Sequence, residues 1–377
     1  MIPQCFLHIG TEKTGSTSIQ YFLSKNREKL EEQGILYARS PGNQNHTALT
    51  VSALRGSRQT HPRRAHAAMR SLGVFSPEQA EQAHENLIRS MDRELADSDA
   101  SIIILSNEHL SSRLLKPRQI RLAKELCDRY AERTTIIVYL RNQVDSLVSS
   151  FGTTIKSGGT RKFPFPLSPS RTRTLDYYAL LKPWRSVFGR KNIIVRRFET
   201  SRFIEGDLFC DFAAQIPFDP TGFRREARNP ALGARELAFL LEFNARVPRW
   251  LDEKTPNLAR GKIVAALESI GGAGPRLKAS PEIASSITAT FEESNRRVAE
   301  EYFGEDELFL PPQLVADVQM EALLELNCSD AMDVACKLWS AQQLQLQKYE
   351  SQRKNRDTQL TEDVDESAPD IDGEDRW

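Results

Sequence analysis

Short apolar runs alternate with amphipathic stretches along roughly the first 200 residues. Runs of this length predict buried strands, and apolar residues repeating every three or four positions predict helices. The expected strands are Cys5–Ile9, Ser101–Leu105, Thr135–Leu140 and Asn192–Arg196. The expected helices are Ser16–Gln33, Pro77–Ala96, Pro117–Glu132, Gln143–Lys156 and Leu175–Phe188. This alternation indicates an α/β fold in which helices cover both faces of a central parallel sheet.

The remaining segments set the expected domain organisation. Residues 40–97 do not follow the alternation and are interpreted as an insertion on the sheet. Residues 1–304 are expected to form one domain, and residues 305–350 a helical C-terminal extension, because apolar positions beyond about residue 230 have helical rather than strand character. The acidic, proline-containing segment 351–377 is expected to be disordered.

Charge and cysteine content restrict the classes of function. Lys and Arg total 51, as do Asp and Glu, so the formal net charge is zero and nucleic acid is not an expected partner. The five scattered cysteines form no CxxC pair and no zinc-like spacing, which indicates a reducing compartment and no metal site. Because no leader segment and no apolar run of about 18 residues is evident, we expect a cytoplasmic protein without a transmembrane segment.

The segment between the first expected strand and helix has the spacing of a phosphate-binding loop. Four residues separate Gly10 from Gly15, and hydroxyl side chains follow at Ser16 and Thr17. A Walker A loop carries lysine directly after its second glycine; this chain has Ser16 there, and its one loop lysine is Lys13. The backbone N–H groups of such a turn can still bind an anion, but the displaced lysine argues against Mg²⁺-dependent ATP chemistry.

The string HIGTEKTGSTSIQYFL resembles the 5′-phosphosulfate-binding loop of sulfotransferases that use 3′-phosphoadenosine 5′-phosphosulfate (PAPS), above all the bacterial members that act on carbohydrates. The resemblance implies a P-loop-type three-layer fold, PAPS as donor and no required metal. It also implies that Lys13 stabilises the leaving phosphate. The residues implied to hold the donor in this loop are Gly10, Thr11, Lys13, Thr14, Gly15, Ser16 and Thr17.

A second motif follows the third expected strand. Arg141 comes directly after Leu140, and Ser149 lies eight residues later on the next helix. In the family that the chain resembles, an arginine and a serine at this spacing bind the 3′-phosphate of PAPS. An arginine at the carboxyl end of a parallel strand faces the ligand crevice. Since eight residues are slightly more than two helical turns, Ser149 can face the same site.

Transfer of a sulfuryl group to a hydroxyl requires a base that accepts the hydroxyl proton. Members of the family that the chain resembles place a His or Glu base near the loop that carries the lysine. Glu108 and His109 follow the second expected strand, and His46 lies in the loop after the first strand–helix unit. Each also has a structural interpretation: Glu108 as a helix cap or ion-pair partner, His109 as a partly buried imidazole, and His46 as an ordinary loop residue. The choice among the three stays open.

These features predict a sulfotransferase that moves a sulfuryl group in line from PAPS to a hydroxyl of a saccharide or glycolipid. The alternatives are a P-loop kinase or other nucleotide phosphotransferase, and a non-catalytic glycan-binding protein of the same fold. The basic stretch 55–70 fits either an anionic glycan or a solvated helix face. The glycine- and proline-containing segment 157–173 suits a mobile lid, and the C-terminal helices suit an acceptor wall or a homodimer surface.

Overall fold

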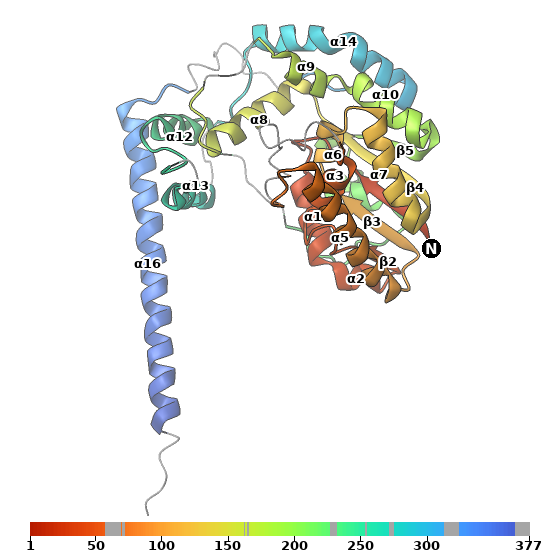
Figure 1. Ribbon diagram of the computed structural model, residues 1–377. Coiled ribbons are helices and arrows are strands. Elements are labelled where there is room, and N and C mark those ends of the chain that lie inside the picture. Colours follow the sequence, from red (N-terminus) through yellow and green to blue (C-terminus); the bar gives the residue numbers. More distant parts are fainter. Residues whose placement is uncertain are drawn as a thin grey trace, which may run out of the picture. The chain divides into compact units, whose positions relative to one another are not determined.

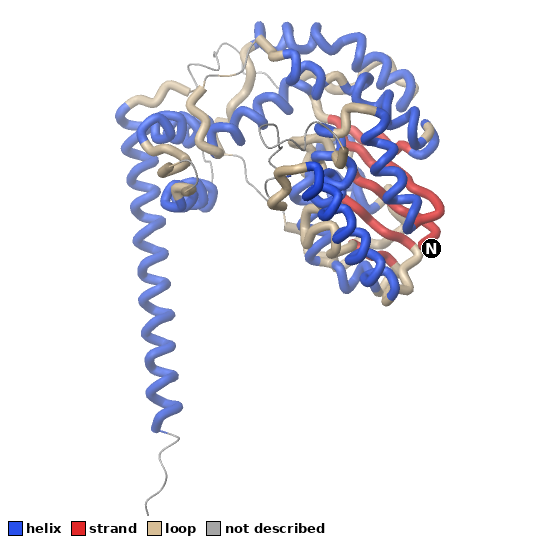
Figure 2. The backbone as a smooth tube through the Cα atoms, in the orientation of Figure 1, coloured by secondary structure: helices blue, strands red, loops and turns tan. Residues whose placement is uncertain are grey.

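The computed structural model describes residues 1–56, 69, 72–161, 163, 166–226, 232–252, 255–270, 275–312 and 324–365. Five parallel strands form one sheet in the order β2-β3-β1-β4-β5 (Figures 1 and 2). The strands are β1 (Ile2–His8), β2 (Ile35–Tyr37), β3 (Ile102–Ser106), β4 (Ala131–Leu140) and β5 (Ile193–Arg197). Because β1 pairs with both β3 and β4, the segments that follow these three strands emerge side by side at the carboxyl edge of the sheet.

Helices pack on both faces of the sheet. One apolar cluster joins the sheet to α1 (Ser16–Lys25), α2 (Arg27–Glu31) and α11 (Leu208–Ala213). A second cluster joins the opposite face to α3 (Thr47–Ala53), α5 (Pro77–Ala96), α6 (His109–Arg113), α7 (Pro117–Tyr130), α10 (Tyr177–Phe188) and α14 (Pro281–Phe303). The remaining elements in this part of the chain are α8 (Gln143–Lys156), α9 (Pro169–Leu175) and the 3₁₀ turns η2 (Arg190–Asn192), η3 (Thr200–Arg202) and η4 (Ile204–Gly206).

Alternation along β1 explains why the sheet has helices on both sides. Phe6 belongs to the α1 cluster, whereas its neighbours Cys5 and Leu7 belong to the α5 cluster. Successive side chains of a strand point to opposite faces, so a strand with buried apolar side chains on both faces must be covered on both. The expected α/β class, with a central parallel sheet between helical layers, is confirmed.

Local structure departs from the sequence expectations at several places, including the expected helix Pro117–Glu132, inside which β4 already begins at Ala131. The expected helix Ser16–Gln33 is broken at Asn26, whose Nδ2 donates to the Phe22 carbonyl at 2.8 Å and so ends α1. The short strand β2 directly follows Gly34 and was not predicted. Helix α9 forms inside the expected loop, where Ser168 caps it and Pro169 occupies its first position.

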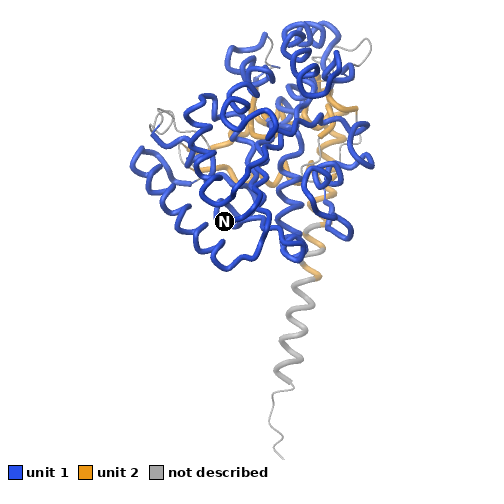
Figure 3. The backbone as a smooth tube through the Cα atoms, turned by 90° about the vertical axis from the view of Figure 1, so that its right-hand side faces the viewer, with its two compact units in different colours: residues 1–153, 161–229, 278–320 blue, residues 154–160, 230–277, 321–377 orange. Residues whose placement is uncertain are grey.

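The chain divides into two compact units, which are coloured separately in Figure 3. The first unit contains the sheet and comprises residues 1–153, 161–229 and 278–320. The second comprises residues 154–160, 230–277 and 321–377, and in it α12 (Ala234–Arg246) and α13 (Leu258–Ile270) both pack against α16 (Cys328–Asp365). The expected C-terminal helices are therefore present, whereas the expected domain boundaries stay a prediction.

Some expectations concern residues outside the described ranges. Residues 57–68 and 70 of the basic stretch and residues 366–377 of the acidic tail are among them. Helix α16 continues to Asp365, so the structure has a helix over the first part of the tail that was expected to be disordered. None of the helices in the described ranges is long and apolar enough to cross a membrane.

Candidate functional site

The loop after β1 reverses direction through three residues with left-handed backbone: Gly10 (φ 53°), Lys13 (φ 71°) and Gly15 (φ 73°). A Cβ on Gly10 would lie 2.7 Å from Ser16 Oγ and 3.0 Å from Glu108 Cβ, so this position has no room for a side chain. Helix α1 then starts with Gly15 as its N-cap, which provides no side-chain acceptor. The first N–H groups of α1 are therefore not capped by a side chain, as an anion-binding helix start requires.

Hydroxyl groups of the loop stabilise the turn itself. Thr11 Oγ1 donates to the Tyr139 carbonyl at 2.9 Å and so ties the loop to β4. Thr14 Oγ1 donates to the Thr11 carbonyl at 2.7 Å, and Ser16 Oγ donates to the same oxygen at 3.3 Å. Thr17 is exposed. Three of the hydroxyls expected to hold a phosphate thus shape the loop, and its backbone N–H groups are the donors best placed for a ligand.

The two motifs identified in the sequence meet at Lys13. Arg141 Nη1 donates to the Lys13 carbonyl at 3.0 Å, and Lys13 Nζ donates to Thr153 Oγ1 at 2.7 Å. Thr153 lies one turn beyond Ser149 on α8 and donates to the Ser149 carbonyl at 3.1 Å. The structure therefore brings Lys13, Arg141 and the Ser149 turn together. Sequence reasoning missed Thr153, although its i+4 spacing from Ser149 placed it on the same helix face.

Arg141 is a largely desolvated cation at the end of β4. Burial lowers its pKa, and the nearby carboxylate of Asp145 partly opposes this shift. The guanidinium lies 5.3 Å from the centre of the Phe198 ring. Its one hydrogen bond to a described residue goes to the Lys13 carbonyl. Since a guanidinium has five N–H donors, Arg141 keeps donors for an anionic ligand.

Glu108 is partly buried at the carboxyl end of β3 and is held by two amides. Gln20 Nε2 donates to Oε2 at 2.8 Å, and Asn45 Nδ2 lies 3.3 Å from both carboxylate oxygens. Asn107 in turn donates to Asn45 Oδ1 and accepts from Thr50 Oγ1 at 2.7 Å. An amide NH₂ can only donate, so Glu108 accepts in both contacts. Gln20 and Asn45 could not be predicted as partners of Glu108, because both lie far from it along the chain.

His46 is fully buried and faces the protein interior. Its Nδ1 accepts the Ser106 backbone N–H at 3.1 Å, and its ring stacks on Tyr37 with 4.5 Å between centroids. Burial lowers its pKa to about 3, so the ring is neutral at pH 7 and its proton is on Nε2. His8 has the same character: its Nδ1 lies 2.8 Å from Ser106 Oγ, and burial lowers its pKa to about 3.

His109 lies in the first turn of α6 and faces the phosphate loop. Its Nδ1 is 3.9 Å from Glu12 Oε1, and Arg113 Nη2, one turn further along α6, is 3.6 Å from the same oxygen. This carboxylate, next to Lys13 in the chain, therefore joins the loop to α6. Over the described ranges, no group of three or more His, Cys, Asp or Glu side chains could hold a metal ion, and the expected lack of a metal stays a prediction.

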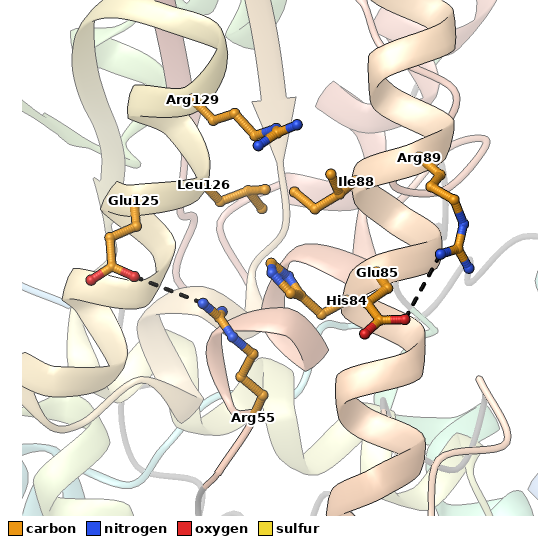
Figure 4. A pocket seen from close by; sticks show the side chains of 8 residues that line it. All are labelled: Arg55, His84, Glu85, Ile88, Arg89, Glu125, Leu126 and Arg129. Atoms are coloured by element: carbon orange, nitrogen blue, oxygen red, sulfur yellow. Dashed lines mark ion pairs between the residues drawn. The ribbon is translucent and has the colours of Figure 1, made fainter.

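A cavity of about 470 Å³ lies elsewhere, between α5 and α7 (Figure 4). Charged side chains that line it are paired with one another: Arg55 Nη2 is 3.7 Å from Glu125, and Arg89 Nη1 is 3.8 Å from Glu85. None of its lining residues belongs to the loops at the carboxyl edge of the sheet. This cavity is therefore not part of the phosphate-loop site.

The chain resembles known proteins in sequence and in structure. No known protein-family profile matches the chain. An uncharacterized protein of Archaeoglobus fulgidus is 30% identical over 224 residues, which are 57% of this chain and 55% of that protein, so the chain spans about half the length of this relative. The crystal structure of a sulfotransferase from Alicyclobacillus acidocaldarius aligns with 80% of this chain and 96% of its own, at 15% identity and a TM-score of 0.42. A likeness at this level does not establish a shared activity.

Burial of His8 and His46 makes stability depend on pH. Because their folded pKa values of about 3 lie below the usual 6.5, the unfolded chain takes up protons first as the pH falls. The contribution of each imidazole to the free energy of unfolding is present above pH 6.5 and is lost as the pH falls toward 3. At pH 5 the loss is about 2 kcal/mol per imidazole. Urea unfolding between pH 7 and pH 5 measures this loss. His46→Gln should lower the slope of the unfolding free energy against pH by about one proton near pH 5. An unchanged slope would contradict a neutral, buried His46.

Proposed function

We propose that the chain is a sulfotransferase that moves a sulfuryl group from PAPS to a hydroxyl of a saccharide or glycolipid. The observation that carries this proposal is the junction of Lys13 with Arg141 and the Thr153 turn of α8. A donor with phosphates at both its 5′ and 3′ positions needs two anion sites, one on either side of its ribose. The glycine loop suits the 5′-phosphosulfate, and Arg141 with Ser149 suits the 3′-phosphate.

Lys13 is proposed to stabilise the leaving phosphate. The acceptor oxygen attacks sulfur in line, the bond from sulfur to the 5′-phosphate oxygen breaks, and the products are a sulfate ester and adenosine 3′,5′-bisphosphate (PAP). Negative charge grows on the phosphate oxygen as that bond breaks. An ammonium group and the N–H groups of the loop, fixed in place before reaction, would stabilise this charge most in the transition state.

Glu108 is the proposed base. It is partly exposed at the same sheet edge as the loop, and Gln20 and Asn45 hold its carboxylate in one orientation. His46 is less suited, because it is fully buried and its low pKa makes it a poor proton acceptor. His109 faces Glu12 and is proposed to support the loop.

Two other functions make different predictions. A P-loop kinase would use Mg²⁺ and ATP, whereas the loop has Ser16 at the usual lysine position. A glycan-binding protein without activity would not need Lys13 and Arg141 in one hydrogen-bonded arrangement. The proposal includes PAPS as the donor and a place among the bacterial carbohydrate-type members of the family. A cytoplasmic location and a homodimer stay predictions.

Replacement of Lys13 tests its role in the transfer. Lys13→Ala should slow the formation of PAP from PAPS by about 10²- to 10³-fold. The assay measures PAP by chromatography, with a panel of methyl glycosides as acceptors and EDTA present. Lys25→Ala is the matched control, because Lys25 is an exposed lysine at the end of the same loop–helix unit. Full turnover in Lys13→Ala would remove this residue from the mechanism.

Replacement of Glu108 tests the choice of base. Glu108→Gln keeps the size of the side chain but cannot accept a proton, so turnover should fall by about 10²- to 10⁴-fold while PAP affinity changes little. Glu28→Gln provides the control, because Glu28 is an exposed residue of α2. If Glu108→Gln retains turnover and the same pH–rate profile, another group accepts the proton.

A further inference from the structure

His46 takes the place of a neighbouring strand at the end of β3. Strand β2 pairs with β3 as far as Tyr37 and Ile104. Two residues further along β3, the Ser106 N–H donates to His46 Nδ1, and the Ser106 carbonyl accepts the His46 backbone N–H, both at 3.1 Å. A ring nitrogen and a backbone amide thus give β3 the two hydrogen bonds that another strand would provide. This pairing fixes the loop that carries His46 against the end of β3.

Asn45, the residue before His46, turns the donor side of its amide toward Glu108. The His109 backbone N–H can only donate, so Asn107 Oδ1 is the acceptor in their 3.0 Å contact. Asn107 Nδ2 therefore faces Asn45 Oδ1, to which it donates. The Asn45 Nδ2 group must then face Glu108, where it lies 3.3 Å from both carboxylate oxygens. A chain of donors and acceptors thus determines the orientation of the amide that holds the proposed base.

The two carboxylate oxygens of Glu108 differ in their contacts. Oε2 accepts from Gln20 Nε2 at 2.8 Å and also lies 3.3 Å from Asn45 Nδ2. For Oε1, the contact with Asn45 at 3.3 Å is the only hydrogen bond within the described ranges. Because a carboxylate oxygen has about two lone-pair positions, Oε1 keeps one for a further partner, whereas both positions of Oε2 are occupied.

We propose that His46 is a positioning residue for Glu108, and that Glu108 Oε1 is the atom that takes the proton of the acceptor hydroxyl as its oxygen attacks sulfur. This inference rests on the proposed function and adds to it the oxygen that accepts the proton and the residue that orients it. His46 holds the loop at β3, Asn45 passes this placement on to the carboxylate, and Gln20 occupies Oε2. Since His46 is fully buried, it acts without touching the substrate.

Two substitutions of His46 separate a positioning role from a purely structural one. Asparagine Oδ1 occupies about the place of histidine Nδ1, so His46→Asn can still accept the Ser106 N–H, whereas the amide of His46→Gln lies one bond further out. Turnover with the panel of methyl glycosides should fall about 10- to 100-fold in His46→Gln, and His46→Asn should regain most of this loss. Affinity for PAP should change in neither variant. Asn43→Ala is the control, because Asn43 is an exposed residue of the same loop.

A double substitution shows whether His46 acts through Glu108. In a chain that already carries Glu108→Gln, adding His46→Gln should cause no further loss of turnover, because the group that His46 positions can no longer accept a proton. Losses that multiply in the double variant would overturn the inference. Equal turnover in His46→Gln and His46→Asn would overturn it as well.

Crystal structures of the two His46 variants test the same point without an acceptor. Asn45 Nδ2 should stay within hydrogen-bond distance of Glu108 in His46→Asn and should leave it in His46→Gln. A PAP titration of the unaltered chain keeps the two proposals apart. Absence of PAP binding would contradict both, whereas PAP binding together with an Asn45–Glu108 contact kept in both variants would contradict the positioning role alone.

Discussion

The left-handed backbone of Lys13 is the constraint on which the site depends. A non-glycine residue with φ of 71° costs about 1 to 2 kcal/mol, and the hydrogen bond from Arg141 to the Lys13 carbonyl helps to hold it there. This contact and the hydrogen bond from Lys13 Nζ to Thr153 Oγ1 join the segments that follow β1 and β4. The Lys13 side chain reaches Thr153 on α8. The strained residue of the loop is therefore also the residue that binds both Arg141 and Thr153.

Motifs with fixed spacing could be predicted well from the sequence. The glycines at 10 and 15 required a tight turn between strand and helix, and α8 begins at Gln143 and ends at Lys156 as expected. Strand β2 was missed because three residues carry too little periodicity to be distinguished. The break at Asn26 depends on a side-chain hydrogen bond to the backbone that a pattern of apolar residues does not reveal.

The candidate bases show where sequence reasoning ends. Glu108, His46 and His109 lie on neighbouring segments of the same sheet edge, so position along the chain does not separate them. Burial separates His46 from the other two: His46 is stacked on Tyr37 with a pKa of about 3, while Glu108 and His109 stay partly exposed. The contacts of Glu108 with Asn45, and of Arg113 with Glu12, join residues far apart in sequence, and only the folded chain brings them together.

A donor with a 3′-phosphate is the central claim of this account, and comparison of two nucleotides tests it most directly. PAP and ADP both carry phosphate at the 5′ position, and PAP alone carries a 3′-phosphate. Calorimetric titration of the purified chain in EDTA should show PAP binding at least about tenfold more tightly than ADP, because only PAP can pair with Arg141. Equal affinity for the two, or nucleotide binding that requires Mg²⁺, would contradict the account.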